Sequence, residues 1–201
     1  MRRLLMLACC LALSACYPAG KRGGDSALAV YDFGPPAPIS SAIAPRSGLA
    51  LEVRAPLWMD SLDIGYRLAY AEPARLRDYT RARWAGPPAQ LIQQHLLREL
   101  GLRPAGQGGS NCVLRVDIDE FVQVFVDATD SHGLVQGRAQ LLDRRRSLVK
   151  AYEFRIEKPA PTPDSRGGVA ALTAAVDQLG RELAAWEKAL PGKSGTSDCP
   201  A

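Results

Sequence analysis

The sequence predicts an α/β fold, in which a single mixed, largely antiparallel sheet carries helices packed mainly on one face. Three observations support this fold class. Short segments of alternating apolar residues predict strands, two longer segments with apolar residues every three or four positions predict helices, and their order is roughly β-β-β-α-β-β-β-α. No internal repeat is visible in the 201 residues, so one domain with a real core is expected.

The first half of the chain contains three expected strands and one helix. Residues 76–85 have a mixed character, and we expect a short turn or helix there. Pro87 and Pro88 then open a clearer helix, because proline is tolerated in the first helical turn, and Gly101 is its natural C-terminal stop. The three strands are expected at residues 28–33, 49–53 and 64–70.

The second half begins with the most strand-like segment of the chain. Apolar and charged residues alternate over 112–119, which predicts a strand with one core face and one solvated face. Beyond Glu120 the residues on both faces of this strand are apolar. A bulge, or other elements covering both faces of the strand, would explain this. A turn at 127–133 leads to two more strands at 134–142 and 148–156.

A final helix is expected over residues 166–190, after a stiff proline-rich connector at 159–163. The simpler interpretation of its narrow apolar stripe is a helix laid across the sheet. The same spacing also fits a coiled-coil seam with a partner helix, so a homo-oligomer is the alternative. The stripe consists of Val169, Leu172, Val176, Leu179, Leu183, Trp186 and Leu190.

The N-terminus has the form of a secretory signal. Arg2 and Arg3 precede an apolar stretch at 4–13, which is shorter than the roughly 20 residues that a transmembrane helix needs. Leu-Ser-Ala-Cys at 13–16 resembles the lipobox of bacterial lipoproteins. We therefore expect cleavage before Cys16 and lipid attachment to its thiol, which anchors the chain to a membrane. Tyr17, where aspartate commonly marks inner-membrane retention, favours the periplasmic face of the outer membrane.

The expected organisation of the chain follows from this interpretation. A signal peptide covers 1–15, the lipidated cysteine and a Gly-rich flexible tether cover 16–27, one domain covers 28–190, and a polar tail covers 191–201.

Composition excludes a nucleic-acid-binding role. The chain has 25 Lys and Arg against 21 Asp and Glu, and removal of the signal leaves 23 against 21, a net charge of +2. No basic run is interleaved with aromatic residues in the manner of nucleic-acid-binding proteins. The one basic cluster, residues 144–146, is interpreted as a solvated hairpin turn, with lipid headgroups or an acidic partner as the alternative.

Two cysteines, Cys112 and Cys199, remain in the mature chain besides the lipidated one. The periplasm is oxidising, so a disulfide between them is one alternative. The other is a buried thiol at Cys112 and a mobile one at Cys199, because the sequence cannot show that they meet.

Catalytic patterns are missing from the sequence, and we expect no enzyme, no cofactor and no bound metal. Neither His95 nor His132 accompanies a nucleophile-elbow motif, and no phosphate-binding loop occurs. Asp117 and Asp119 would share one face of their strand, whereas Glu120 would lie on the other, which disfavours a cation site.

Several segments occur together, in order, behind the lipobox. In this arrangement the chain resembles the ABC-type transport auxiliary lipoprotein family, which includes the paraquat-inducible outer-membrane lipoproteins. The segments are Val-Tyr-Asp-Phe-Gly-Pro at 30–35, Ile-Gly-Tyr-Arg at 64–67, Tyr-Thr-Arg-Ala-Arg-Trp-Ala-Gly-Pro-Pro at 79–88, Phe-Val-Gln-Val-Phe at 121–125 and the final helix with Ala-Ala-Trp at 184–186.

The resemblance implies a non-enzymatic role beside an ABC transporter whose periplasmic partner carries mammalian-cell-entry (MCE) domains. Such a system is expected to move lipid between the inner and outer membranes. Large aromatic residues and arginine commonly anchor interfaces, so the candidate partner-binding residues are Trp58, Tyr66, Arg67, Tyr79 and Trp84, each with core packing as the alternative. Two competing hypotheses are an envelope-structural or outer-membrane assembly lipoprotein and a secreted hydrolase that uses His95 or His132 with a carboxylate.

Overall fold

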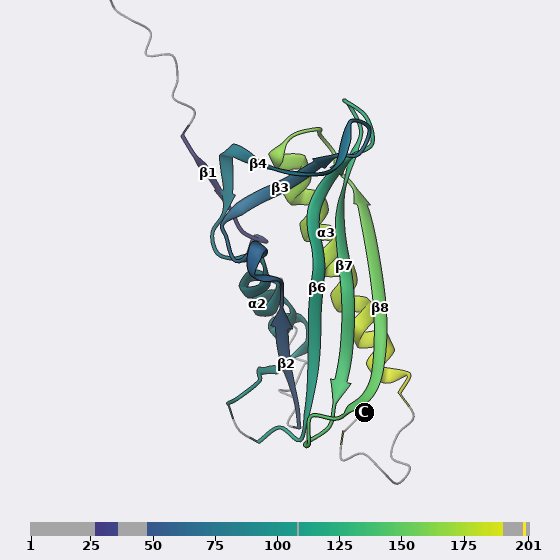
Figure 1. The fold of residues 1–201 in the computed structure, drawn as a ribbon. Helices are drawn as coiled ribbons and strands as arrows, with labels where there is room; N and C mark the ends of the chain where they lie inside the picture. Colours follow the sequence, from purple (N-terminus) through teal and green to yellow (C-terminus); the bar gives the residue numbers. More distant parts are fainter. Residues whose placement is uncertain (1–26, 36–47, 108, 191–198, 200–201) are drawn as a thin grey trace, which may run out of the picture.

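The computed structural model describes residues 27–35, 48–107, 109–190 and 199. Within them, an eight-stranded mixed sheet carries two α-helices (Figure 1), which confirms the predicted fold class. The elements are β1 (Ala29–Tyr31), β2 (Leu49–Arg54), the 3₁₀ turn η2 (Leu57–Met59), β3 (Asp63–Leu68), β4 (Glu72–Trp84), α2 (Pro88–Leu100), β5 (Arg103–Pro104), β6 (Cys112–Phe125), β7 (Ser131–Leu142), β8 (Leu148–Pro159) and α3 (Ser165–Lys188).

Strand β6 organises the sheet because it pairs along both of its edges. On one edge it pairs antiparallel with β7, which in turn pairs antiparallel with β8. The other edge is divided between two parallel partners. Strand β2 covers the first half, from Cys112 to Asp117, and β3 covers the end, from Gln123 to Phe125. Strands β4 and β1 extend the sheet beyond β3, and β5 extends it beyond β2.

A bulge interrupts β6 at the point where its two parallel partners change over. The register with β7 shifts between Ile118 and Glu120. This confirms the bulge, one of the two explanations for the loss of alternation beyond Glu120. The chain passes from β2 to β3 through η2, so this short turn bridges the divided edge of β6.

Both helices pack on the sheet and against each other. Helix α3 packs across β6, β7 and β8, whereas α2 packs on β2 and contacts α3 (Figure 1). Five residues of the apolar stripe are buried, which favours the helix laid across the sheet over a seam with a partner helix. These are Val169, Leu172, Val176, Leu179 and Leu183.

Helix α2 begins at Pro88 and ends at Gly101, whose left-handed φ of 63° closes the helix as expected. Its Gln93 side chain accepts the Val53 N–H of β2 at 2.9 Å, so the helix also satisfies a backbone donor of the sheet.

The expectation of a short turn or helix at 76–85 is wrong, because these residues belong to the 13-residue strand β4. Asp63 of β3 pairs with Arg83, but Gly65, only two residues later, pairs with Asp78. The extra β4 residues form a bulge that changes which side chains face the core. This shift removes the simple alternation by which a strand is recognised.

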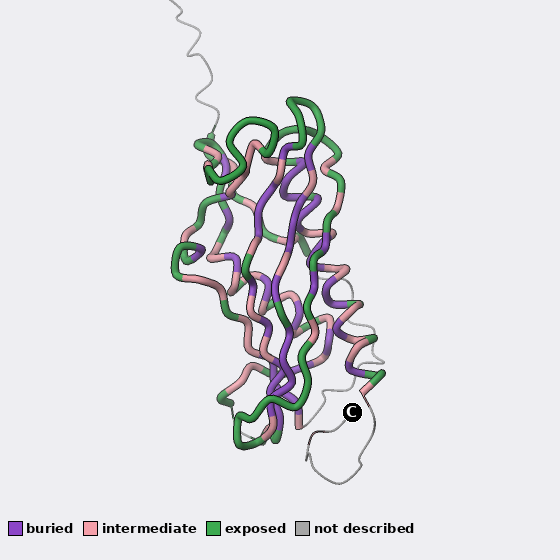
Figure 2. Tube along the Cα trace, turned by 45° about the vertical axis from the view of Figure 1, so that its right-hand side comes forward, coloured by how far each residue is buried: buried purple, intermediate pink, exposed green. Residues whose placement is uncertain are grey.

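The main core lies between the sheet and the two helices. Figure 2 shows buried residues along the central strands and exposed residues in the turns at both ends of the molecule. Large members of this core include Ile64, Trp84, Leu96, Leu114 and Leu179, which come from both halves of the chain.

Candidate partner-binding surface

The 3₁₀ turn η2 presents two large apolar side chains to solvent. Leu57 is 91% exposed and its neighbour Trp58 is 52% exposed. The Met59 N–H donates to the Pro56 carbonyl at 2.9 Å, which closes the turn, and the buried Met59 side chain anchors the turn in the core. Adjacent exposed apolar residues on an anchored turn are typical of a contact site, because burying them against a partner is favourable.

Tyr66 and Tyr79 lie together on β3 and β4, with ring centroids 4.7 Å apart. The Tyr79 hydroxyl donates to the Gln123 side-chain oxygen at 2.8 Å, and the Gln123 amide donates to Ser131 Oγ at 2.8 Å. Gln123 is 0% exposed, so these bonds satisfy an otherwise costly buried amide. Burial, and then the neighbouring Tyr66, raise the pKa of Tyr79, which keeps the hydroxyl protonated as a donor.

Helix α3 packs closely against the Gln123 side chain at Gly168. A Cβ atom at this position would overlap the side-chain oxygen of Gln123. The glycine therefore allows the first turn of α3 to cover Gln123 and the end of β6. Both tyrosines are partly exposed, but the Tyr79 hydroxyl is engaged in this internal network, so Tyr66 is the better candidate for a partner contact.

Arg67 also makes an internal contact. Its guanidinium lies 3.1 Å from a Glu120 carboxylate oxygen, and the Arg67 side chain is 21% exposed. The pair joins β3 to the bulge of β6. Removing one partner of a partly buried ion pair lowers the free energy of unfolding more than removing one partner of an exposed pair does. Arg67 can reach a partner only by sharing or giving up this contact.

Trp84 is a core residue and does not contribute to the surface. It is 1% exposed and packs against the rings of Phe33 and Phe121, each 5.5 Å away between centroids. It lies beyond the bulge of β4, where the side chain turns inward. Core packing, the alternative to a partner-binding role for this residue, is what the structure shows.

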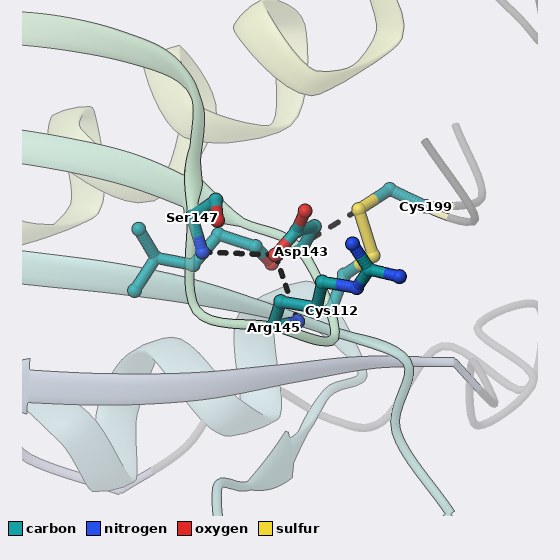
Figure 3. The surroundings of a disulfide bond; sticks show 6 residues. Cys112, Asp143, Arg145, Ser147 and Cys199 are labelled. Carbon is teal, nitrogen blue, oxygen red and sulfur yellow. Dashed lines mark hydrogen bonds between the residues drawn. A yellow bond between two sulfur atoms is a disulfide. The ribbon is translucent and has the colours of Figure 1, made fainter. Parts of the chain in front are cut away.

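A disulfide joins Cys112, the first residue of β6, to Cys199, and their Cα atoms are 5.4 Å apart. Figure 3 shows the bond beside the β7–β8 turn, where the Asp143 carboxylate accepts the N–H groups of Arg145 and Ser147, each at 2.8 Å. The basic cluster at 144–146 lies in this exposed turn. The bond places residue 199, near the end of the polar tail, at the sheet.

The expected signal peptide, the expected lipidation residue Cys16 and the expected tether up to residue 26 lie outside the described residues. Among the helices of the described segments, none combines the length and apolarity needed to cross a membrane.

The family model of the ABC-type transport auxiliary lipoprotein component matches residues 31–184, which is more than half of the chain. The chain belongs to this family. The match contains η2, the tyrosine pair and the Gln123 network. No curated protein sequence matches this chain significantly.

Two solved structures share the fold of this family member. A protein from Xanthomonas campestris is 22% identical with a TM-score of 0.64, and the alignment covers 78% of this chain and 93% of that one. An uncharacterized protein is 17% identical with a TM-score of 0.62, and the alignment covers 80% of this chain and 99% of that one. At these identities the likeness supports the fold alone.

Proposed function

We propose that this lipoprotein is the outer-membrane component of an ABC transport system whose periplasmic partner carries MCE domains. In this proposal, the protein is held by lipid on Cys16 at the periplasmic face of the outer membrane. It docks or receives the far end of a conduit that moves lipid between the two membranes. It supplies neither energy nor catalysis, and it requires no cofactor.

Membership of the ABC-type transport auxiliary lipoprotein family carries this proposal. The lipobox at 13–16 supports membrane attachment, since acyl chains contribute about 0.8 kcal/mol for each buried CH₂ group and more than one chain makes an anchor stable. The outer-membrane location rests on Tyr17, and the MCE partner rests on what the family resemblance implies.

The η2 turn is the part of the surface best suited to contact the partner. Leu57 and Trp58 are already exposed, whereas Arg67 and Tyr79 are engaged within the protein and Trp84 is buried. Tryptophan is enriched among residues that dominate binding energy, because it buries a large area at a small conformational cost. Tyr66, partly exposed, is the second candidate.

The hydrolase alternative has one supporting observation. His95 Nε2 lies 2.8 Å from Asp177 Oδ1, and His95 also lines a cavity of about 480 Å³ beside α2. The described residues that line this cavity include no serine, threonine or cysteine, so it offers no hydroxyl or thiol nucleophile there. A chain with both His95→Ala and His132→Ala would retain its envelope function if the non-enzymatic proposal holds. Loss of function in the folded variant would favour the hydrolase.

Affinity purification of the protein from crosslinked envelopes, followed by mass spectrometry, tests the proposal. We expect an MCE-domain protein to be recovered with the wild-type chain. Recovery of outer-membrane assembly factors without any MCE-domain protein would contradict the transport role and support the envelope-structural alternative. A Cys16→Ser variant is the matched control for anchoring, and we expect it to leave the outer-membrane fraction.

A further inference from the structure

We propose that His95, Glu99 and Asp177 form a binding site for a divalent transition metal ion, with Zn²⁺ as the first choice. The site lies at the contact between α2 and α3. It is separate from the η2 turn, and it does not depend on the proposed transport function.

The three side chains converge from two helices. His95 and Glu99 are one turn apart on α2, so they share a face of that helix, and Asp177 reaches them from α3. One ligand atom from each residue lies within 4.8 Å of those of the other two. His95 Nε2 is 2.8 Å from Asp177 Oδ1 and 3.7 Å from Glu99 Oε2.

These separations suit a tetrahedral ion after small side-chain movements. Ligand atoms about 2.0–2.1 Å from Zn²⁺ stand about 3.3 Å from one another in a tetrahedron. The two measured separations from His95 Nε2 lie on either side of that value. Binding would replace the direct contact between the imidazole and Asp177, and a water molecule would complete the coordination, as in other sites with three protein ligands.

The ligand types select the class of ion. One imidazole nitrogen with carboxylate oxygens suits Zn²⁺ and neighbouring transition metals, whereas Mg²⁺ and Ca²⁺ prefer sites made of oxygen atoms. The two described cysteines are joined to each other in the disulfide, so neither thiolate competes for the ion.

Glu99 shows independently that the cluster favours an added positive charge. Its Oε2 atom is buried and accepts no hydrogen bond. Two carboxylates held this close repel each other, and a divalent cation between them would relieve both the repulsion and the missing contact.

The surrounding fold keeps space for the Glu99 carboxylate and holds the histidine ring. A Cβ atom at Gly180 of α3 would overlap Glu99 Oε2, so the glycine provides the recess in which this oxygen lies. Phe33 packs edge-on against the His95 ring, with centroids 5.6 Å apart. A bound ion would therefore link α2 to α3 at a point where both helices are already positioned.

Isothermal titration of ZnCl₂ into the untagged, full-length lipoprotein in detergent, in a buffer that does not chelate metals, tests this site. We expect one Zn²⁺ per chain and a rise in the unfolding temperature, with no comparable response to MgCl₂. The His95→Gln and Asp177→Asn variants should each lose this binding. His132→Gln is the matched control, because His132 also lies near one carboxylate, Glu157 at 3.7 Å, and it should bind as the wild type does.

Three results would overturn the assignment. They are absence of Zn²⁺ binding to the folded wild type, unchanged affinity in both His95→Gln and Asp177→Asn, and loss of binding in His132→Gln instead. Circular dichroism of each variant separates a lost ligand from a lost fold. If one variant does not fold, the other still decides the outcome.

Discussion

Two regions of this lipoprotein differ in where their apolar residues lie. Strands β6, β7 and β8 pack against α3 and supply much of the buried core, and their exposed apolar residues Leu148 and Val149 lie at the start of β8. The region formed by β1, η2, β3 and β4 carries a large bulge and exposes Leu57 and Trp58 in a surface turn, although it also contributes Trp84 to the core. The second region therefore combines a buried inner face with an exposed apolar turn.

This difference predicts that the two regions contribute unequally to stability. Removing a buried side chain from the first region, or from the Gln123 network that joins the two, should lower the free energy of unfolding. Removing the Leu57 side chain of η2 should leave that energy nearly unchanged, because Leu57 is 91% exposed in the free protein. Substitutions in both regions test this difference, beginning with the one that should destabilise the protein most.

The largest effect is expected for Leu179→Ala, at the centre of the α3–sheet contact. Leu179 is fully buried, so the substitution should lower the free energy of unfolding by about 2–5 kcal/mol through lost burial and a new cavity. Denaturant unfolding measures this difference. Ala185→Ser on the exposed side of the same helix is the control, and a similar loss in both variants would contradict the packing of α3 against the sheet.

Loss of the Cys112–Cys199 disulfide is expected to have the next largest effect. Cys199→Ser should lower the free energy of unfolding by about 2–4 kcal/mol, because the bond closes a loop across a sequence separation of 87 and restricts the unfolded chain. Thermal unfolding of the oxidised wild type, the reduced wild type and the variant measures the effect. The reduced wild type and the variant should agree, and equality of all three would contradict the bond.

Tyr79→Phe tests the buried network between the two regions. The change removes the hydroxyl that donates to the Gln123 side-chain oxygen, which cannot reach water because Gln123 is 0% exposed. A cost of about 1–3 kcal/mol is expected for this unsatisfied group. Tyr70→Phe is the control in the exposed β3–β4 turn, where Tyr70 is 53% exposed, and urea unfolding should show no comparable change there.

The helix cap of α3 should give a smaller, pH-dependent effect. The Gly167 N–H, and then the Thr162 hydroxyl, lower the pKa of Asp164 by bonding to its charged carboxylate. Asp164→Ala should therefore cost about 1 kcal/mol at neutral pH.

The sign of the pH dependence follows from the lowered pKa. The contribution of Asp164 is complete above the unfolded-state pKa, about 3.9, and is lost as the pH falls through the lower folded-state value. Unfolding curves of the wild type and Asp164→Ala should thus converge in acid. A difference that persists unchanged far below this range would rule out the charged cap.

The smallest effect on stability is expected for Leu57→Ala. Because Leu57 is 91% exposed and stands on a surface turn, the free energy of unfolding should change by no more than about 0.5 kcal/mol in urea unfolding. Recovery of the transport partner should nevertheless fall. A large loss of stability would instead assign Leu57 to the structural part of this region.

The strand beginning at Cys112 and the final helix could be predicted from sequence because each has a clear periodicity over much of its length. Alternation over residues 112–119, and apolar residues every three or four positions in the helix, predict both elements where they lie. Strand β4 could not be predicted because Pro73 and several arginines dilute its apolar pattern and the bulge reverses its faces. The inward position of Trp84 depends on that bulge.

The internal contacts of the candidate residues could not be predicted for a different reason. Gln123 stands alone as a polar residue among the apolar residues 121–125, which indicates a buried amide, but its partner Tyr79 is 44 residues away. His95 and Asp177 are even farther apart in the sequence and meet only because α2 and α3 pack together. Such pairs require the tertiary fold, whereas the exposure of Trp58 could only be proposed from its residue type.

Site-specific photocrosslinking in intact cells tests whether the η2 turn contacts the transport partner. A photoreactive amino acid would replace Trp58 in one variant and Tyr70 in a second variant, since both side chains are similarly exposed. We predict a crosslink to an MCE-domain protein from position 58 and none from position 70. Crosslinks to that protein from neither position, or from position 70 alone, would contradict the assignment of the η2 turn as the partner-binding surface.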